Sequence, residues 1–339
     1  MAKLFGLEFA PILIPLRRRI QTLAVMQWIA SFLFLGFFCS LVFVYLCFTR
    51  LWPLAVLYLG WFVYDRKTPF RGGRRIESVR HWSLWKYFRD FFPLNLVKSC
   101  DLDPNKNYIF ALHPHGVLCV SHFCSFATEG TGFSKLFPGL TPYLLVLDGH
   151  FSFPFYRDYF MSAGTCGCNK SSLEYILRSK GQGNAACLAI GGALEALEAH
   201  PGHYTLNLAK KMGFIKSAIR TGASIVPVFS FGENEVFVQV NNPHGSKVRA
   251  LQQWLTKYLG FSPPLFHGRG IFQYSFGLIP YRKPVTTVVG EPLEVTHNAE
   301  PTNQEVAELH ARYIAALQHL FETHKAEYGI PQVEHLKFI

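Results

Sequence analysis

The sequence predicts an α/β fold in two parts, an N-terminal membrane hairpin followed by a layered α/β domain. Residues 22–49 contain no charged side chain, and residues 51–64 are again uncharged. From about residue 100, short apolar runs alternate with helical patterns, which is typical of a sheet covered by helices. We therefore divide the chain into a cytosolic segment 1–21, a hairpin 22–64, an interfacial segment 65–99 and a main domain 100–339.

Composition limits the classes of partner. Of the 339 residues, 50% are hydrophobic and 16% are charged, so the chain is not disordered. The formal net charge of +11 suits nucleic acid, anionic lipid or a phosphorylated small molecule. Because the sequence has no zinc-finger spacing and no continuous basic helix, we expect one of the last two partners and no nucleic acid.

Positive charges flank the apolar region on both sides. Residues 17–19 are three arginines, and the following flank carries Arg66, Lys67, Arg71, Arg74 and Arg75. Positive flanks stay in the cytosol, so we expect both termini there and a turn near residues 49–53. The first arm exceeds the ~20 residues that a spanning helix needs and the second does not, so the second should be shallower or tilted. A single span ending near Arg50 is the alternative.

Residues 81–97 combine aromatic and charged side chains at helical spacing. The aromatic and apolar members are Trp82, Trp85, Phe88, Phe92 and Leu96. Such a helix suits the headgroup plane of a membrane, which is why we assign an interfacial segment. An ordinary amphipathic core helix is the alternative.

The main domain carries a regular series of elements. Apolar runs predict strands at 108–112, 143–147, 185–190, 225–231 and 285–289. Helices are expected at 171–179, 193–199 and 213–221. Thr302 and Glu305 form a capping-box pattern before a last helix, whose stripe of apolar residues we interpret as a packing face.

Two histidines follow the first of these strands, His113 and His115, in a His-Pro-His-Gly turn that ends at Gly116. Sheets of this class place reactive groups at strand ends, and a neutral imidazole can accept a proton near pH 7. The residues alone also allow a structural pair or a metal site. Because Cys166 and Cys168 lack a second pair at zinc spacing, we expect no metal.

Three further turns carry candidate groups. Gly191 and Gly192 precede Glu195, which either orients a histidine or interacts with a helix dipole. The basic turn 210–216 suits phosphate, with a solvated surface as the alternative. Arg157 either holds an anion or pairs with the next residue, an aspartate.

Together these motifs resemble the type-two diacylglycerol acyltransferase family, which includes monoacylglycerol acyltransferases and wax-ester synthases. The motifs that carry the resemblance lie at residues 113–116, 154–158, 191–195, 211–214, 226–234 and 288–292. Phe32, Leu33, Phe34 and Leu35 resemble the family's proposed neutral-lipid motif. The opening, at residues 8–11 and 18–25, looks most like the monoacylglycerol branch.

The resemblance implies a multi-pass endoplasmic-reticulum enzyme, also associated with lipid droplets, with a catalytic acyltransferase domain at 100–339. It would transfer an acyl group from acyl-CoA to monoacylglycerol, or to diacylglycerol, with membrane lipid as a further partner. It implies catalytic roles for His115, His113 and Glu195. The implied substrate contacts are Gly116, Arg157, Gly191, Gly192, Lys211, Phe214, Glu233 and Asn234. No cofactor is implied, because acyl-CoA is a substrate whose thioester is already activated.

The resemblance leaves three points open. Phosphate-type glycerolipid acyltransferases, more distantly similar, carry an aspartate five residues after the histidine. Val120 stands there in this chain, so the partner of His115 must come from elsewhere. A diacylglycerol or wax-alcohol acyltransferase, a non-catalytic lipid-droplet scaffold and a metal-dependent lipid hydrolase are the alternative functions. The sequence does not decide whether the chain forms a homo-oligomer.

Overall fold

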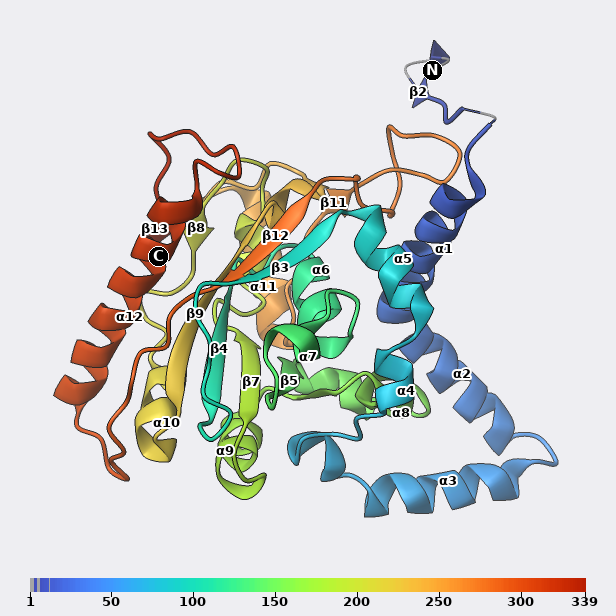
Figure 1. Ribbon diagram of the computed structural model, residues 1–339. Coiled ribbons are helices and arrows are strands. Elements are labelled where there is room, and N and C mark those ends of the chain that lie inside the picture. Colours follow the sequence, from blue (N-terminus) through green and yellow to red (C-terminus); the bar gives the residue numbers. More distant parts are fainter. Residues whose placement is uncertain (1–2, 5–6, 12) are drawn as a thin grey trace.

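A computed structural model describes residues 3–4, 7–11 and 13–339, and its centre is a sheet with helices on both faces (Figure 1). Within the described chain the sheet has seven strands, in the order β3 (Leu94–Lys98), β12 (Val285–Val289), β9 (Ser224–Phe231), β4 (Tyr108–His113), β7 (Asn184–Ala189), β5 (Thr141–Val146) and β6 (Thr165–Gly167). β12 is antiparallel to β9, and the other neighbouring pairs are parallel. The expected α/β fold is confirmed.

The five predicted strands correspond to β4, β5, β7, β9 and β12. Every residue of β4 and β9 is buried, because helices cover both faces of the sheet and leave no polar side for alternation. The sequence did not reveal β3 and β6, which are the two edge strands. β3 alternates buried and exposed residues and β6 has three residues, so neither produces a continuous apolar run.

Three helices cover the face of the sheet at the left of Figure 1: α9 (Lys170–Ser179), α10 (Gly213–Thr221) and α12 (Asn303–His324). The predicted capping box of α12 is present, and its apolar stripe packs on β9. The expected helix at 193–199 is wrong, because only one 3₁₀ turn, Glu195–Glu198, forms there. The Gln239 side chain donates to the carbonyls of Ala196 and Ala199, which takes the place of helical bonds.

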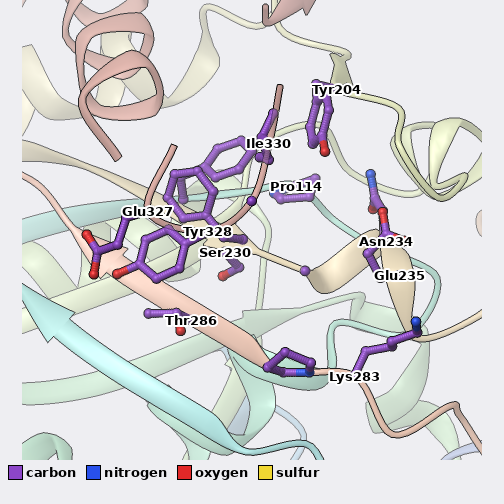
Figure 2. Close-up of a pocket in the computed structure, with 15 residues that line it drawn as sticks. Pro114, Tyr204, Ser230, Asn234, Glu235, Lys283, Thr286, Glu327, Tyr328 and Ile330 are labelled. Carbon is purple, nitrogen blue, oxygen red and sulfur yellow. The ribbon is translucent and has the colours of Figure 1, made fainter. Parts of the chain in front are cut away.

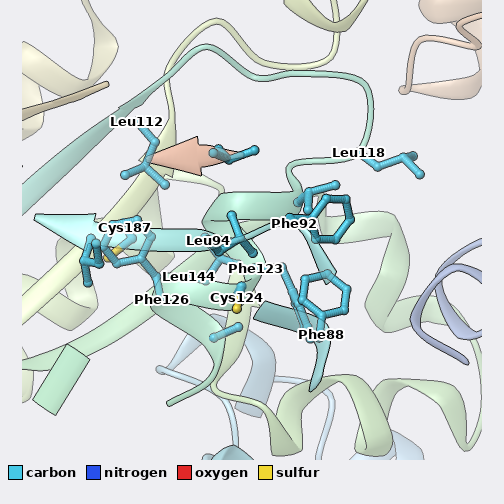
Figure 3. Packing of buried hydrophobic residues seen from close by; sticks show 14 of the residues in the cluster. Phe88, Phe92, Leu94, Leu112, Leu118, Phe123, Cys124, Phe126, Leu144 and Cys187 are labelled. Carbon is cyan, nitrogen blue, oxygen red and sulfur yellow. The ribbon is translucent and has the colours of Figure 1, made fainter. Parts of the chain in front are cut away.

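The other face is covered by α1 (Leu16–Ala30), α5 (Ser83–Phe91), α6 (Val120–His122), a π-helix at Phe123–Ala127 and α7 (Phe133–Leu136). Phe88 and Phe92 pack there with Phe123 in one apolar cluster (Figure 3). The interfacial role expected for 81–97 is therefore wrong for its aromatic face, because α1 packs along α5 and closes Trp85 and Phe88 into the core. Trp82 alone of the tryptophans there stays exposed, at 46%.

The apolar N-terminal region forms two helical arms. The first continues from α1 through a π-helix at Ser31–Leu35 into α2 (Gly36–Cys47), and the second is α3 (Trp52–Tyr64). Among the described residues one helix, Leu16–Cys47, is long and apolar enough to cross a membrane. The 13 residues of α3 fall short of the ~20 required. The chain does turn between the arms, but a hairpin that re-crosses the membrane stays a prediction.

Both arms expose large apolar side chains that no part of the described chain covers. They include Phe37, Phe38, Leu41, Tyr45, Trp52, Leu57 and Tyr64. An exposed surface of this kind is not expected in contact with water.

The remaining elements are β1 (Lys3–Leu4), β2 (Leu7–Glu8), α4 (Glu77–Arg80), α8 (Tyr156–Ser162), β8 (Thr205–Leu206), β10 (Val238–Gln239), α11 (Lys247–Leu259), β11 (Phe266–His267), β13 (Lys337–Phe338) and 3₁₀ turns at Thr68–Phe70, Asp148–Ser152 and Glu233–Glu235.

Candidate active site

The candidate site begins where β4 ends. His113 is fully buried, and its Nε2 lies 2.8 Å from the hydroxyl of Tyr313 on α12. Burial lowers the pKa of His113 to about 3, so its ring is neutral. The structure thus places His113 behind the turn as an anchor to α12, and not at a surface that substrate reaches.

His115 lies two residues further and is half-buried. Its Nδ1–H donates to the carbonyl oxygen of Gly116 at 3.0 Å, so in the neutral ring the lone pair is on Nε2. Burial lowers the pKa of His115 below its usual value. A neutral imidazole with Nε2 available to accept a proton is the requirement for a general base.

The backbone of this turn is held by Glu195. Its Oε1 accepts the His115 backbone N–H at 2.8 Å, and its Oε2 accepts the Asn207 N–H at 2.7 Å. Burial raises the pKa of Glu195 to about 7, against the effect of these two bonds. A Cβ on Gly191 would lie 1.9 Å from Glu195 Oε2, so only glycine fits there. Glu195 therefore orients His115 through its backbone and not through the ring.

Glu233 holds the next part of the chain in the same way. Its two oxygens accept the backbone N–H groups of Val120 and Ser121, at 2.7 and 2.9 Å. Burial raises its pKa to about 7 as well. Gly116 has a φ of +62° and a Cβ there would lie 2.7 Å from the Glu233 side chain. Glu233 thus places a carboxylate against the backbone at position 120, where the sequence itself has valine.

A cavity of about 520 Å³ adjoins the turn at Pro114 (Figure 2). Its walls come from the end of β9, the start of β12 and the residues after α12, and Asn234 is one of them. The Asn234 amide donates to the carbonyl of His203 at 2.9 Å. The structure therefore brings Gly116 against Glu233 and places Asn234 in the wall of the cavity beside Pro114, and their roles as substrate contacts stay a prediction.

The other predicted substrate contacts, Gly192, Lys211 and Phe214, differ in where the structure places them. Gly192 lies at the turn before Glu195 with a φ of +63°, and Lys211 is half-buried and near enough to act electrostatically on Glu195. Phe214 is buried against Tyr313, with ring centroids 5.1 Å apart. A substrate contact by Phe214 is therefore wrong, because the residue lies in the first turn of α10 on its core side.

The role expected for Arg157, as an anion clamp or a partner of Asp158, is also wrong. It is buried, and its Nη2 lies 2.9 Å from Asp65 and donates to the Asp65 carbonyl as well. Arg74 bridges Asp65 and Asp158, at 2.6 and 2.7 Å. Among the described residues Arg157 pairs with Asp65 and not with Asp158, because the end of α3 brings Asp65 to it. This cluster fixes α3 to α8.

The lipid-motif residues lie on the π-helix between α1 and α2. Phe32 and Leu33 pack against the core and Leu35 against Phe151 and its neighbours, whereas Phe34 is 55% exposed. Phe32 also lines a narrow apolar crevice between this helix and α8, with Phe123 on its inner side. The motif is thus partly a packing segment, and contact with neutral lipid stays a prediction.

Other residues near the site gave no signal in the sequence. Tyr313 belongs to the stripe that we interpret as packing, and only its hydroxyl distinguishes it. Asn207 lies in an irregular segment. Asp148, which the motifs do not explain, accepts from the Cys168 backbone and the Asn169 amide and so positions the cap of α9. Among the described residues no three His, Cys, Asp or Glu side chains gather to hold a metal ion.

Comparison with known proteins decides the family. A diacylglycerol acyltransferase family profile matches residues 44–339. The chain belongs to this family. It is 51% identical to 2-acylglycerol O-acyltransferase 1 of Bos taurus over 98% of this chain and 99% of that protein. It is 48% identical to diacylglycerol O-acyltransferase 2 of Xenopus laevis over 95% of this chain and 90% of that protein.

The chain is therefore an O-acyltransferase enzyme, as the motifs predict, and its substrates are an acyl donor and an acylglycerol. A solved bacterial 1-acyl-sn-glycerophosphate acyltransferase, PlsC from Thermotoga maritima, covers 89% of this chain and 97% of that chain, with 12% identity and a TM-score of 0.38. That likeness is too low to carry an argument about the site.

Proposed function

We propose that the chain is an acyl-CoA:2-acylglycerol O-acyltransferase, which converts monoacylglycerol to diacylglycerol. The observation that carries this is the neutral His115 ring at the end of β4, with Nδ1 bound to Gly116 and Nε2 available as a base. The acceptor follows from the 51% identity with a 2-acylglycerol O-acyltransferase. Because diacylglycerol relatives reach 48%, diacylglycerol is the second candidate acceptor.

In the proposed reaction His115 Nε2 removes the proton of the acceptor hydroxyl as the oxygen attacks the thioester carbonyl. The new C–O bond forms, the C–S bond breaks, and the proton passes to the departing CoA thiolate. The products are an ester and free CoA, and no oxidant or reductant is consumed. The Gly116 N–H is our candidate donor to the oxyanion. His113 and Glu195 act by positioning.

An acceptor panel tests the reaction. Microsomes that contain the protein receive labelled acyl-CoA with pure monoacylglycerol, diacylglycerol or a long-chain alcohol. We expect the highest turnover with monoacylglycerol, and His115→Ala should lower it at least ~100-fold, the usual contribution of a general base. His81→Ala, at an exposed histidine outside the site, should match the wild type. Equal turnover in His115→Ala would remove this residue from the mechanism, and lipid-droplet binding without transfer by the wild type would favour a scaffold.

We also propose that α2 and α3 lie in the endoplasmic-reticulum membrane with both termini in the cytosol, and that the protein moves to lipid droplets. The exposed apolar arms and the basic residues on both flanks support this. Tags at residues 1 and 339 should both be digested when protease is added to sealed microsomes. Protection of one tag would contradict the hairpin and indicate a single span.

A further inference from the structure

The cavity beside the catalytic turn has a definite relation to His115. In the sheet His113 of β4 lies opposite Phe229 of β9, so residues 230–232 continue beside Pro114 and Gly116. Pro114 itself lines the cavity, which holds about 520 Å³ (Figure 2). A ligand that fills this space therefore ends beside the residue that precedes His115.

The walls combine apolar and uncharged polar groups. Tyr204, Phe231 and Tyr328 supply aromatic surface, and Ser230 and Thr286 supply hydroxyl groups. Asn234 is only 7% exposed, and its Oδ1 has no hydrogen-bond partner among the described residues, although its amide nitrogen is bound to His203. A buried acceptor without a partner is costly, and a turn of this side chain toward the cavity would let its oxygen accept an N–H or O–H from a ligand.

The charges around the cavity disfavour phosphate in its interior. Glu235 and Glu327 contribute two negative charges, and Lys283 contributes one positive charge. Glu235 is held in place by the Gly202 backbone N–H at 2.7 Å. A phosphate group would meet a lining with one more negative than positive charge, which favours a ligand that is uncharged where it lies inside.

We propose that this cavity binds the pantetheine arm of acyl-CoA, an inference that rests on the proposed function. Pantetheine is the uncharged part of the donor and ends at the thioester, which must reach His115. Its amide N–H groups match Asn234 Oδ1, and its dimethyl group matches the aromatic walls. The charged nucleotide would then stay outside, near the exposed Lys283.

The position of the cavity agrees with the solubility of the two substrates. Tyr328 and Ile330 of its wall follow α12, which covers the face of the sheet opposite α1 (Figure 1). The exposed apolar arms α2 and α3 continue from the α1 side. A water-soluble donor would thus arrive at one face of the sheet and a lipid acceptor at the other, with His115 between them.

The test compares acyl-CoA with S-acyl-pantetheine, which lacks the nucleotide. Asn234→Leu, which keeps the size but removes the acceptor oxygen, should raise KM about tenfold or more for both donors and leave KM for monoacylglycerol unchanged. Lys283→Glu should raise KM for acyl-CoA only. Asn95→Leu and Lys135→Glu, which line a different surface hollow, are the matched controls and should change neither value.

Three results would overturn the assignment: an unchanged donor KM in Asn234→Leu, a raised KM for monoacylglycerol alone, or an effect of Lys283→Glu on the truncated donor. If Asn234→Leu does not fold, Thr286→Val removes one hydroxyl from the same wall at constant shape. If the wild type transfers to no acceptor, the proposed function fails. Binding of labelled pantetheine to purified wild type and to the variants then tests the cavity without turnover.

Discussion

The turn at residues 114–121 and the arginine cluster of Arg157, Asp65, Arg74 and Asp158 both carry family-like motifs, yet their side chains are used in opposite ways. In the turn, two carboxylates bind backbone N–H groups, and the His115 ring keeps one nitrogen for a substrate. In the arginine cluster each charged group is bound to another group of the same cluster or to a carbonyl.

The difference shows how to distinguish the residues of a motif that can react with substrate from those that hold the fold together. A buried charge that is paired with an opposite charge and with carbonyl oxygens of other segments serves to join those segments. Arg157 joins α8 to the end of α3 in this way. A ring whose backbone is fixed but whose base nitrogen is unused is prepared for reaction.

The largest expected effect breaks the arginine cluster. Arg157→Met leaves the carbonyls of Phe62 and Asp65 without their donor and weakens the pairing of a buried carboxylate. Removing one partner of such a pair should lower the free energy of unfolding by about 3 kcal/mol. Thermal unfolding in detergent measures this, and turnover per folded molecule should stay within about threefold of the wild type. Normal stability with a raised KM for acyl-CoA would restore the role of an anion clamp.

A smaller effect is expected from the carboxylates of the turn. In Glu195→Gln the amide can accept only one of the two N–H bonds, from His115 and Asn207, and its NH₂ group opposes the other. Displacing His115 should lower kcat about 100-fold. Glu233→Gln acts further along the chain, at Val120 and Ser121, so its loss should be smaller. The reverse order, in kcat at saturating substrates, would make Glu233 the main support of His115.

These contrasts also mark what the sequence can predict. The strands β4 and β9 follow from their apolar runs, and the capping box of α12 follows from local spacing, because both depend on neighbours in sequence. The functions of Glu195 and Arg157 do not. Glu195 meets His115 across 80 positions and Arg157 meets Asp65 across 92, so the partner of each depends on how the layers pack. The motif identifies the residue, and the fold determines which group that residue binds.

The pH dependence of activity distinguishes titration of the His115 ring from titration of the Glu195 and Glu233 carboxylates. His115 works as a base only when neutral, and burial lowers its pKa, so activity should fall as the pH drops through a value below 6.5. Burial raises the pKa values of Glu195 and Glu233 to about 7, so a shallower loss should begin there as these carboxylates take up protons and release backbone N–H groups. Profiles of kcat/KM for the wild type and Glu233→Gln should differ in that upper step. A single steep limb at or above 7 would assign control to the carboxylates.

The smallest effect concerns His122, on α6 immediately after the turn. Its ring is fully buried, neither nitrogen has a partner within the described chain, and burial lowers its pKa to about 3. Replacing a buried polar group that makes no hydrogen bond by an apolar one removes its desolvation penalty, so His122→Leu should raise the free energy of unfolding by about 1 kcal/mol. His310→Leu is the matched control, because His310 is also buried but its Nε2 donates to the Leu208 carbonyl at 3.2 Å. This control should lose stability where His122→Leu gains it, and thermal unfolding of the two variants measures both signs. A loss of stability in both variants would mean that the His122 ring makes a hydrogen bond in the folded protein. His122 would then join segments, as the arginine cluster does.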